Sequence, residues 1–141
     1  MRRLLIGVGN PTRGDDAAGI EVARRVRRVE AMQKTSGSYE LMDAWEGADE
    51  VIVVDAARSG APAGTIHRFD AHDDPLPAGV LATSTHSVGV IETIEMARSL
   101  GRLPGRMVVY GIEVGSLSLG AGLSDQVEEA VNGLVAEIDH A

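Results

Sequence analysis

Two short runs that are apolar at every position constrain the fold more than any other feature of the sequence. Residues 4–8 read LLIGV and are followed by Gly9, and residues 51–54 read VIVV and are followed by Asp55. A short run without polar positions indicates a strand that is buried on both faces, as central strands of parallel sheets are. The sequence therefore predicts an α/β protein in which helices cover both faces of a sheet.

The other periodic segments extend this pattern. The connector between the strand at 51–54 and the next strand is too short for a helical crossover, so that next strand should run antiparallel. The order of elements predicts a three-layer α/β/α sandwich with a mostly parallel sheet of about five strands, in a single domain over residues 1–141. Ser124 is the expected N-cap of the last helix. The expected helices are 16–28, 38–47, 86–100 and 124–139, and the further strands are 29–34, 65–69 and 107–112.

Four arginines gather at the end of the first predicted helix. A solvated face that complements the helix dipole explains this cluster, and docking of an acidic partner segment is the alternative. The four are Arg24, Arg25, Arg27 and Arg28.

Composition excludes several classes of protein. The chain has 141 residues, a formal net charge of −8, no cysteine and 3% aromatic residues. It therefore lacks disulfides, thiolate nucleophiles and cysteine zinc sites. Net acidity without a basic run argues against nucleic acid as a partner. No apolar run is long enough for a signal sequence or a membrane span, so we expect a cytoplasmic protein that does not bind membranes.

Acidic residues and one histidine occupy the positions where α/β proteins bind ligands, outside the carboxyl ends of the strands. Asp15 and Asp16 follow the first strand, Asp55 follows the strand at 51–54, and His86 opens the helix 86–100. Two carboxylates and one neutral imidazole form a ligand set that suits a divalent transition metal.

These residues also have structural interpretations. One aspartate of the pair Asp15 and Asp16 can cap a helix, and His86 can be an ordinary surface residue. A carboxylate after four apolar residues is harder to explain in this way, because burying Asp55 is costly without a charged or hydrogen-bonding partner. The polar segment 67–74 contains further potential ligands, and we interpret it as a strand end that runs into a loop.

Two other classes of protein are argued against because each requires a residue that this sequence lacks at one position. Gly7 and Gly9 begin a dinucleotide-binding pattern, but Thr12 occupies its sixth position. Paired acids and Asp55 also resemble a phosphate-receiving response-regulator domain, which needs a lysine at the end of its last strand. Glu113 stands there instead, and Lys34 is the only lysine of the chain.

Four blocks of sequence, in this order along the chain, resemble the hydrogenase maturation proteases. The blocks are GVGNPTRGDDAAGIEVA (7–23), EVIVVDAARSGAPAGTI (50–66), STHSVGVIETIEMARSLGRLP (84–104) and VVYGIEVGSLSLGAGLS (108–124). The resemblance implies a mixed five-stranded sheet of order 2-1-3-5-4, with the fourth strand antiparallel. It also implies an endopeptidase, aspartic-type by family assignment, that removes the C-terminal extension of a nickel-loaded nickel–iron hydrogenase large-subunit precursor.

The resemblance further implies how the site works. The family holds no permanent metal of its own, and it recognises nickel that the precursor carries. By alignment Asp16, Asp55 and His86 would contact this nickel, Asp16 and Asp55 would be catalytic, and the loop of Gly9, Asn10 and Asp15 would support them. The family often has glutamate at the first acidic position, which leaves Asp15 as the alternative to Asp16. The expected partners are the precursor and, transiently, nickel-insertion accessory proteins.

Two alternatives belong to other functional classes. One is a peptidase of the same fold that carries its own metal ion and acts on another substrate. The other is a module that binds nickel or the precursor without cleaving it.

Overall fold

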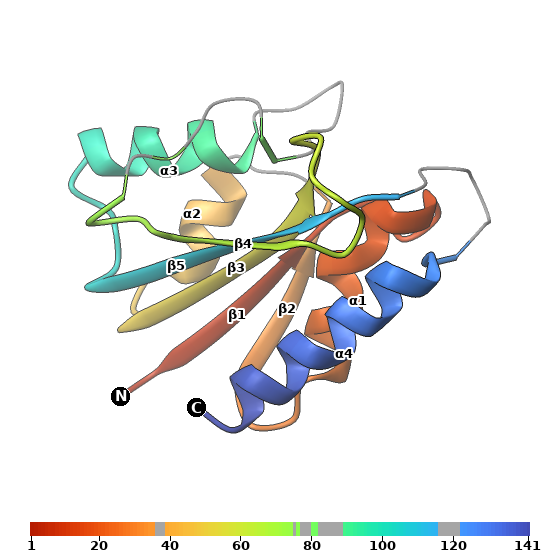
Figure 1. Ribbon diagram of the computed structural model, residues 1–141. Coiled ribbons are helices and arrows are strands. Elements are labelled where there is room, and N and C mark those ends of the chain that lie inside the picture. Colours follow the sequence, from red (N-terminus) through yellow and green to blue (C-terminus); the bar gives the residue numbers. More distant parts are fainter. Residues whose placement is uncertain (36–38, 75, 77–79, 82–88, 116–121) are drawn as a thin grey trace.

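The described residues form one mixed sheet in the order β2-β1-β3-β5-β4 (Figure 1). The computed structural model describes residues 1–35, 39–74, 76, 80–81, 89–115 and 122–141. Strand β4 runs antiparallel to β5, and the other neighbouring pairs are parallel. Both the predicted order and the predicted directions are therefore confirmed. The strands are β1 (Arg3–Val8), β2 (Glu30–Lys34), β3 (Glu50–Ala57), β4 (Ile66–Asp70) and β5 (Arg106–Glu113).

Helices cover both faces of this sheet, which confirms the three layers (Figure 1). Strand β3 shows why, because alternate residues enter opposite cores: Val51 and Val53 pack with α2 and α3, whereas Ile52 and Val54 pack with α1 and α4. None of the helices in the described part of the chain has the length and hydropathy needed to span a bilayer. The helices are α1 (Ala18–Arg25), α2 (Tyr39–Trp45), α3 (Val90–Ser99) and α4 (Asp125–Asp139), and a 3-10 turn, η1 (Gly14–Ala17), precedes α1.

The first helix is shorter than predicted. Helix α1 ends at Arg25, and Val26 is extended, with φ −67° and ψ 146°. Arg27 and Arg28 therefore lie outside the helix, where their backbone N–H groups donate to the Asp139 carboxylate at 3.0 and 2.9 Å. The prediction that all four arginines complement the helix dipole was wrong, because the chain leaves the helix early to begin β2.

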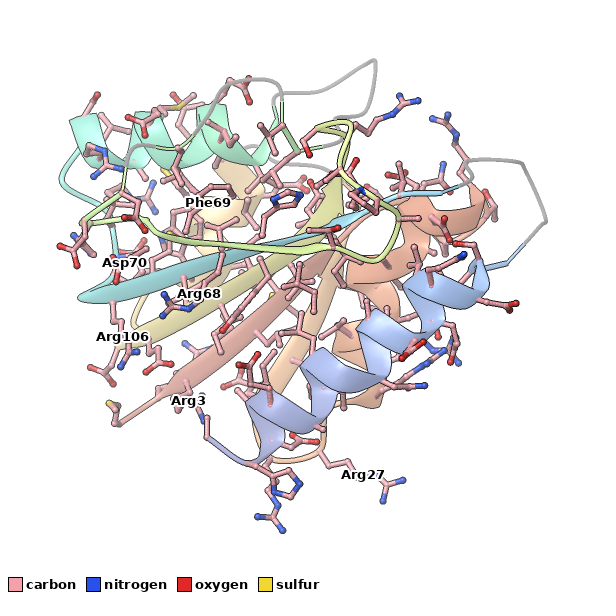
Figure 2. All side chains as sticks on the ribbon, viewed as in Figure 1. Arg3, Arg27, Arg68, Phe69, Asp70 and Arg106 are labelled. Atoms are coloured by element: carbon pink, nitrogen blue, oxygen red, sulfur yellow. The ribbon has the colours of Figure 1, made fainter. Side chains whose placement is uncertain are left out.

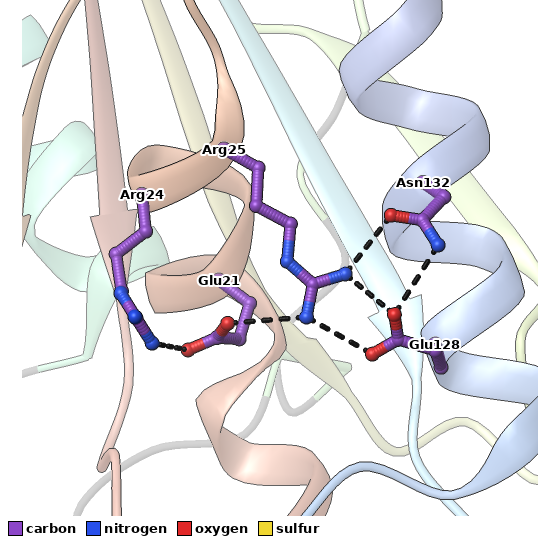
Figure 3. Close-up of polar contacts among 5 residues, drawn as sticks. All are labelled: Glu21, Arg24, Arg25, Glu128 and Asn132. Carbon is purple, nitrogen blue, oxygen red and sulfur yellow. Dashed lines mark hydrogen bonds and ion pairs between the residues drawn. The ribbon is translucent and has the colours of Figure 1, made fainter.

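Arg25 instead joins the two helices on its face of the sheet (Figure 3). Its guanidinium bonds to both carboxylate oxygens of Glu128 on α4, at 2.6 and 3.0 Å, and to Glu21 on α1 at 3.2 Å. A two-pronged contact of this kind fixes the relative orientation of two helices more strongly than a single ion pair does.

Glycines allow α1 to pack with its backbone directly against the sheet. A Cβ atom on Gly19 would lie 2.2 Å from the Val54 carbonyl oxygen and 2.6 Å from that of Val8. A Cβ atom on Gly7 would lie 2.1 Å from the Gly19 carbonyl oxygen. Because these neighbours are backbone atoms, a side chain at either position forces the helix away from β1 and β3.

We predict that Gly19→Ala lowers the free energy of unfolding by about 3 kcal/mol, since overpacking against backbone is among the costlier substitutions. Gly133→Ala is the matched control, because Gly133 lies in α4 and a Cβ atom there would meet nothing within 4 Å. That control should gain about 0.5–1 kcal/mol from helix propensity. Urea denaturation measures both, and equal stability of Gly19→Ala and the wild type would contradict this packing argument.

Candidate functional site

Asp55 lies inside β3, near its carboxyl end. The prediction that the strand ends at Asp55 was wrong: the strand continues to Ala57, because β5 also continues and pairs Ala57 with Glu113. Asp55 pairs with Gly111 and is 1% exposed. Its Oδ1 atom accepts a hydrogen bond of 2.8 Å from the backbone N–H of Ala56.

The environment of Asp55 favours its protonated form. Burial raises the pKa of this carboxyl group well above the ordinary value, and the hydrogen bond from Ala56 only partly opposes this. The negative charge of Asp16 raises the pKa of Asp55 further. The two carboxyl groups therefore lie close enough for the charge of one to affect the pKa of the other.

Asp16 is held by the turn that follows β1. It lies in η1 and is partly buried, and its Oδ2 atom accepts a bond of 3.2 Å from the Asn10 N–H. The Asn10 side chain in turn accepts bonds from the N–H and hydroxyl of Thr12, at 3.0 and 2.8 Å. Burial raises the pKa of Asp16, and the Asn10 N–H and the charges of Arg13 and Arg58 partly offset this. Asn10 thus closes the turn and orients Asp16.

The neighbouring Asp15 is a structural residue that binds the segment before α4. It is fully buried, and its carboxylate accepts bonds from the Gly115 N–H at 2.6 Å, the Ser124 N–H at 2.7 Å and the Ser124 hydroxyl at 2.8 Å. Ser124 occupies the N-cap of α4 as predicted, but its hydroxyl makes no cap bond to the helix and donates to Asp15. Asp15 therefore ties the turn after β1 to the start of α4.

Sequence reasoning missed a further buried carboxylate besides Asp55 and Asp15. Glu113 ends β5, is 3% exposed, and accepts bonds from the Ser59 N–H at 2.9 Å, the Ser59 hydroxyl at 2.6 Å and His67 Nε2 at 3.0 Å. Burial opposes ionisation, but these bonds hold the pKa of Glu113 below its ordinary value. The signal was available, because Glu113 follows the run 107–112 in the sequence just as Asp55 follows the apolar run 51–54.

The group of Ser59, His67 and Glu113 anchors the loop after β3. It does not have the geometry of a nucleophilic triad, because Ser59 at 3.4 Å and Glu113 at 3.0 Å both reach the same nitrogen, Nε2 of His67. A triad uses the two nitrogens of the imidazole for its two partners. We therefore assign this group to holding β4 and the loop against β5.

The third predicted ligand, His86, lies in residues 82–88, outside the described residues. Within the ranges that the structure describes, no three His, Cys, Asp or Glu side chains are grouped so that they could hold a metal ion. Asp16 and Asp55 are thus the members of the predicted set that the structure brings together.

The raised pKa of Asp55 predicts how stability depends on pH. Between the unfolded and the folded pKa the native state binds more protons than the unfolded state, so stability falls as pH rises through this window. Asp55→Asn keeps the acceptor for Ala56 and cannot ionise, so it should raise the melting temperature above pH 7 and flatten the decline. Thermal melts from pH 4 to pH 8 test this, and a less stable Asp55→Asn variant at pH 8 would contradict it.

Asp15 should matter for stability instead. Asp15→Ala leaves buried donors of Gly115 and Ser124 without their acceptor, at a cost of about 2–4 kcal/mol in unfolding free energy. Asp43→Ala is the control, because Asp43 has a 71% exposed side chain that pairs with Arg102, and such pairs contribute about 0–1 kcal/mol. Denaturant titration measures the unfolding free energy of both variants. Equal losses of unfolding free energy would contradict the role assigned to Asp15.

Comparison with known proteins places the chain in one family. The model of the family "HycI: Hydrogenase maturation protease" matches residues 20–141, a range that includes Asp55 and His86 but begins after Asp16. The chain is similar to the hydrogenase expression/formation protein HupD of Thiocapsa roseopersicina, with 28% identity over 137 residues that cover 91% of this chain. It spans only 62% of that relative's length.

Two further similarities cover nearly all of the chain. The hydrogenase 2 maturation protease of Escherichia coli is 27% identical over 150 residues, which cover 98% of this chain and 88% of that protein. The solved [NiFe] hydrogenase maturation protease HybD from Thermococcus kodakarensis shares the fold, with a TM-score of 0.80 at 23% identity. The superposition covers 99% of this chain and 98% of that chain. Because the family model matches most of its length, the chain belongs to the hydrogenase maturation protease family.

Proposed function

We propose that this protein is an endopeptidase that removes the C-terminal extension of a nickel-loaded nickel–iron hydrogenase large-subunit precursor. Family membership supports the reaction class. The observation that carries the proposal is the interacting pair of carboxyl groups, Asp16 and Asp55, at the carboxyl edge of parallel strands. This edge is where α/β proteins bind substrates.

In this proposal nickel is part of the substrate. Asp16, Asp55 and His86 would contact the nickel held by the precursor, and oxygen and imidazole ligands suit such an ion. Asp16 is preferred to Asp15 as the first ligand, because the Asp15 carboxylate already accepts bonds from Gly115 and Ser124.

Nickel would also change the protonation of Asp55. Its carboxyl group favours the protonated form because it is buried beside the negative Asp16. A docked cation stabilises both carboxylates, so binding of the loaded precursor would release the proton of Asp55. A precursor without nickel would supply no such charge and would leave Asp55 protonated, which makes nickel loading a checkpoint before cleavage.

Hydrolysis requires a group that accepts a proton from the attacking water. Asp16 is the member of the pair that is partly exposed, and the N–H of Asn10 keeps its carboxylate oriented. We assign proton acceptance to Asp16 and substrate docking mainly to Asp55. Binding of the precursor through nickel would place the scissile peptide bond close to both groups.

The proposal predicts cleavage of nickel-loaded precursor and none of the nickel-free form. Mass spectrometry of the precursor after incubation should show loss of a C-terminal peptide in the first case only. Asp16→Asn should slow cleavage by about a hundredfold or more, as loss of a catalytic base does. Asp55→Asn should also slow cleavage strongly, because the nickel-loaded precursor would lose a docking carboxylate. Asp43→Asn, at an exposed position, should cleave at the wild-type rate.

Other outcomes distinguish the alternative functions. A stoichiometric metal ion that remains with the purified protein would favour a peptidase with its own metal. A stable complex with the precursor but unchanged precursor mass would favour a binding module. Normal cleavage by Asp16→Asn would show that this residue is not the working acid.

A further inference from the structure

Asp55 is closed off from solvent, although the proposed function requires it to contact an ion that another protein carries. The residue is only 1% exposed. Carboxylate oxygens bind divalent transition metals at about 2 Å, so a neighbouring group must move before the nickel of a docked precursor can reach Asp55. The neighbours of Asp55 therefore determine how the site opens.

Several apolar neighbours of Asp55 are fixed because they belong to the sheet. Val53 and Ala57 lie on the same face of β3 as Asp55, since side chains alternate along a strand, and both are fully buried. Val8, the last residue of β1, lies beside Asp55 in the neighbouring strand. None of these three residues can move aside without disrupting the strands that hold the sheet together.

Leu81 covers Asp55 from outside the five strands. Gly111 is the partner of Asp55 on β5. A Cβ atom on Gly111 would lie 2.9 Å from Leu81 Cδ2 and 3.0 Å from Ala57 Cβ. The Leu81 side chain therefore occupies the space that a side chain at Gly111 would fill, next to Asp55, and Leu81 is itself only 4% exposed.

Few backbone contacts hold Leu81 in this place. Ala57 and Leu81 form an isolated antiparallel bridge, and the Arg58 N–H donates to the Val80 carbonyl oxygen at 2.6 Å. We call residues 80–81 the strap. If the strap leaves β3, it loses these contacts and exposes Leu81, whereas β3 keeps its pairing with β1 and β5.

We propose that the strap is a cover that the nickel-loaded precursor displaces from β3 when it docks. This inference rests on the proposed function. Asp16 is partly exposed, so it can contact the nickel while the strap is still in place. Coordination of the ion by Asp55 then favours the open form, because a ligand shifts a conformational equilibrium toward the state that it binds better. A precursor without nickel lacks this differential affinity and leaves the strap on β3.

Truncation of Leu81 should make docking easier although it removes a buried side chain. Leu81→Ala weakens the closed form, and apparent affinity rises with the fraction of protein that is already open. We expect KM for loaded precursor to fall about fivefold or more with kcat unchanged. Binding of nickel-free precursor, measured by biolayer interferometry, should not change. An unchanged or raised KM in Leu81→Ala would overturn the inference.

Leu41→Ala is the matched control for this experiment. Leu41 is fully buried in the same apolar core as Leu81, but it lies on α2. Its truncation should also destabilise the fold while KM stays at the wild-type value. The comparison separates release of the strap from general loosening of the core.

A disulfide can hold the strap closed, because the chain has no cysteine of its own. The bond from Arg58 to Val80 flanks Ala57 and Leu81 as in a pair without mutual hydrogen bonds, whose Cα atoms lie about 4.5 Å apart. Disulfides span about 4.4–6.8 Å between Cα atoms. The double variant Ala57→Cys with Leu81→Cys, oxidised and freed of oxidant, should bind and cleave loaded precursor at least tenfold less well than after reduction.

Arg68→Cys with Tyr110→Cys is the control pair. These residues face each other across the antiparallel pairing of β4 and β5. Figure 2 shows Arg68 and Phe69 on opposite faces of β4, and Phe69 packs on the same core as Leu81, so this disulfide lies on the other face. Its oxidation should leave cleavage unchanged.

The outcomes separate this inference from the proposed function. Normal cleavage of loaded precursor by the wild type together with normal cleavage by the oxidised variant at Ala57 and Leu81 would overturn only the role of the strap. A wild-type protein that does not cleave loaded precursor would overturn the proposed function itself.

Discussion

The contact of the α1 backbone with the sheet is the constraint on which the rest of the site depends. Gly19 lies against the carbonyl oxygens of Val8 and Val54, the last residues of β1 and of the apolar run in β3. Gly9 extends this contact, because a Cβ atom there would lie 2.1 Å from the Asp16 carbonyl oxygen. The turn after β1 can therefore approach β3 closely, and this places Asp16 within electrostatic range of Asp55.

Because of this packing, the adjacent residues Asp15 and Asp16 have different roles. Asp15 is buried, and its hydrogen bonds to the start of α4 stabilise the folded state. Asp16 remains partly exposed and interacts with Asp55, so its charge is available to a substrate. Keeping two carboxyl groups close in a poorly solvated place costs stability, and the recognition of a metal cation that we propose for this site would account for that cost.

Much of what the sequence predicts correctly depends on which residues must be buried. The apolar runs identified β1 and β3, the short connector identified β4 as antiparallel, and Asp55 stood out because a carboxylate after apolar residues needs an explanation. These inferences need only local sequence and general rules. The family resemblance added the strand order, which the structure confirms.

The features that could not be predicted depend on partners far apart in the chain. The bonds of Asp15 to Ser124 and of Arg25 to Glu128 join residues more than a hundred positions apart. The end of α1 at Arg25 was missed because the arginines that follow have ordinary helix propensity, and the requirement to enter β2 overrides it. The site role of His86 remains a prediction.

The central claim is that Asp16 and Asp55 act as one interacting pair. A ¹³C NMR titration of the Asp55 carboxyl group, in the wild type and in Asp16→Asn, tests this most directly. The account predicts that the pKa of Asp55 lies well above the ordinary value in the wild type, and that it falls in Asp16→Asn because a neighbouring negative charge is removed. An ordinary Asp55 pKa in the wild type, unchanged in Asp16→Asn, would contradict it.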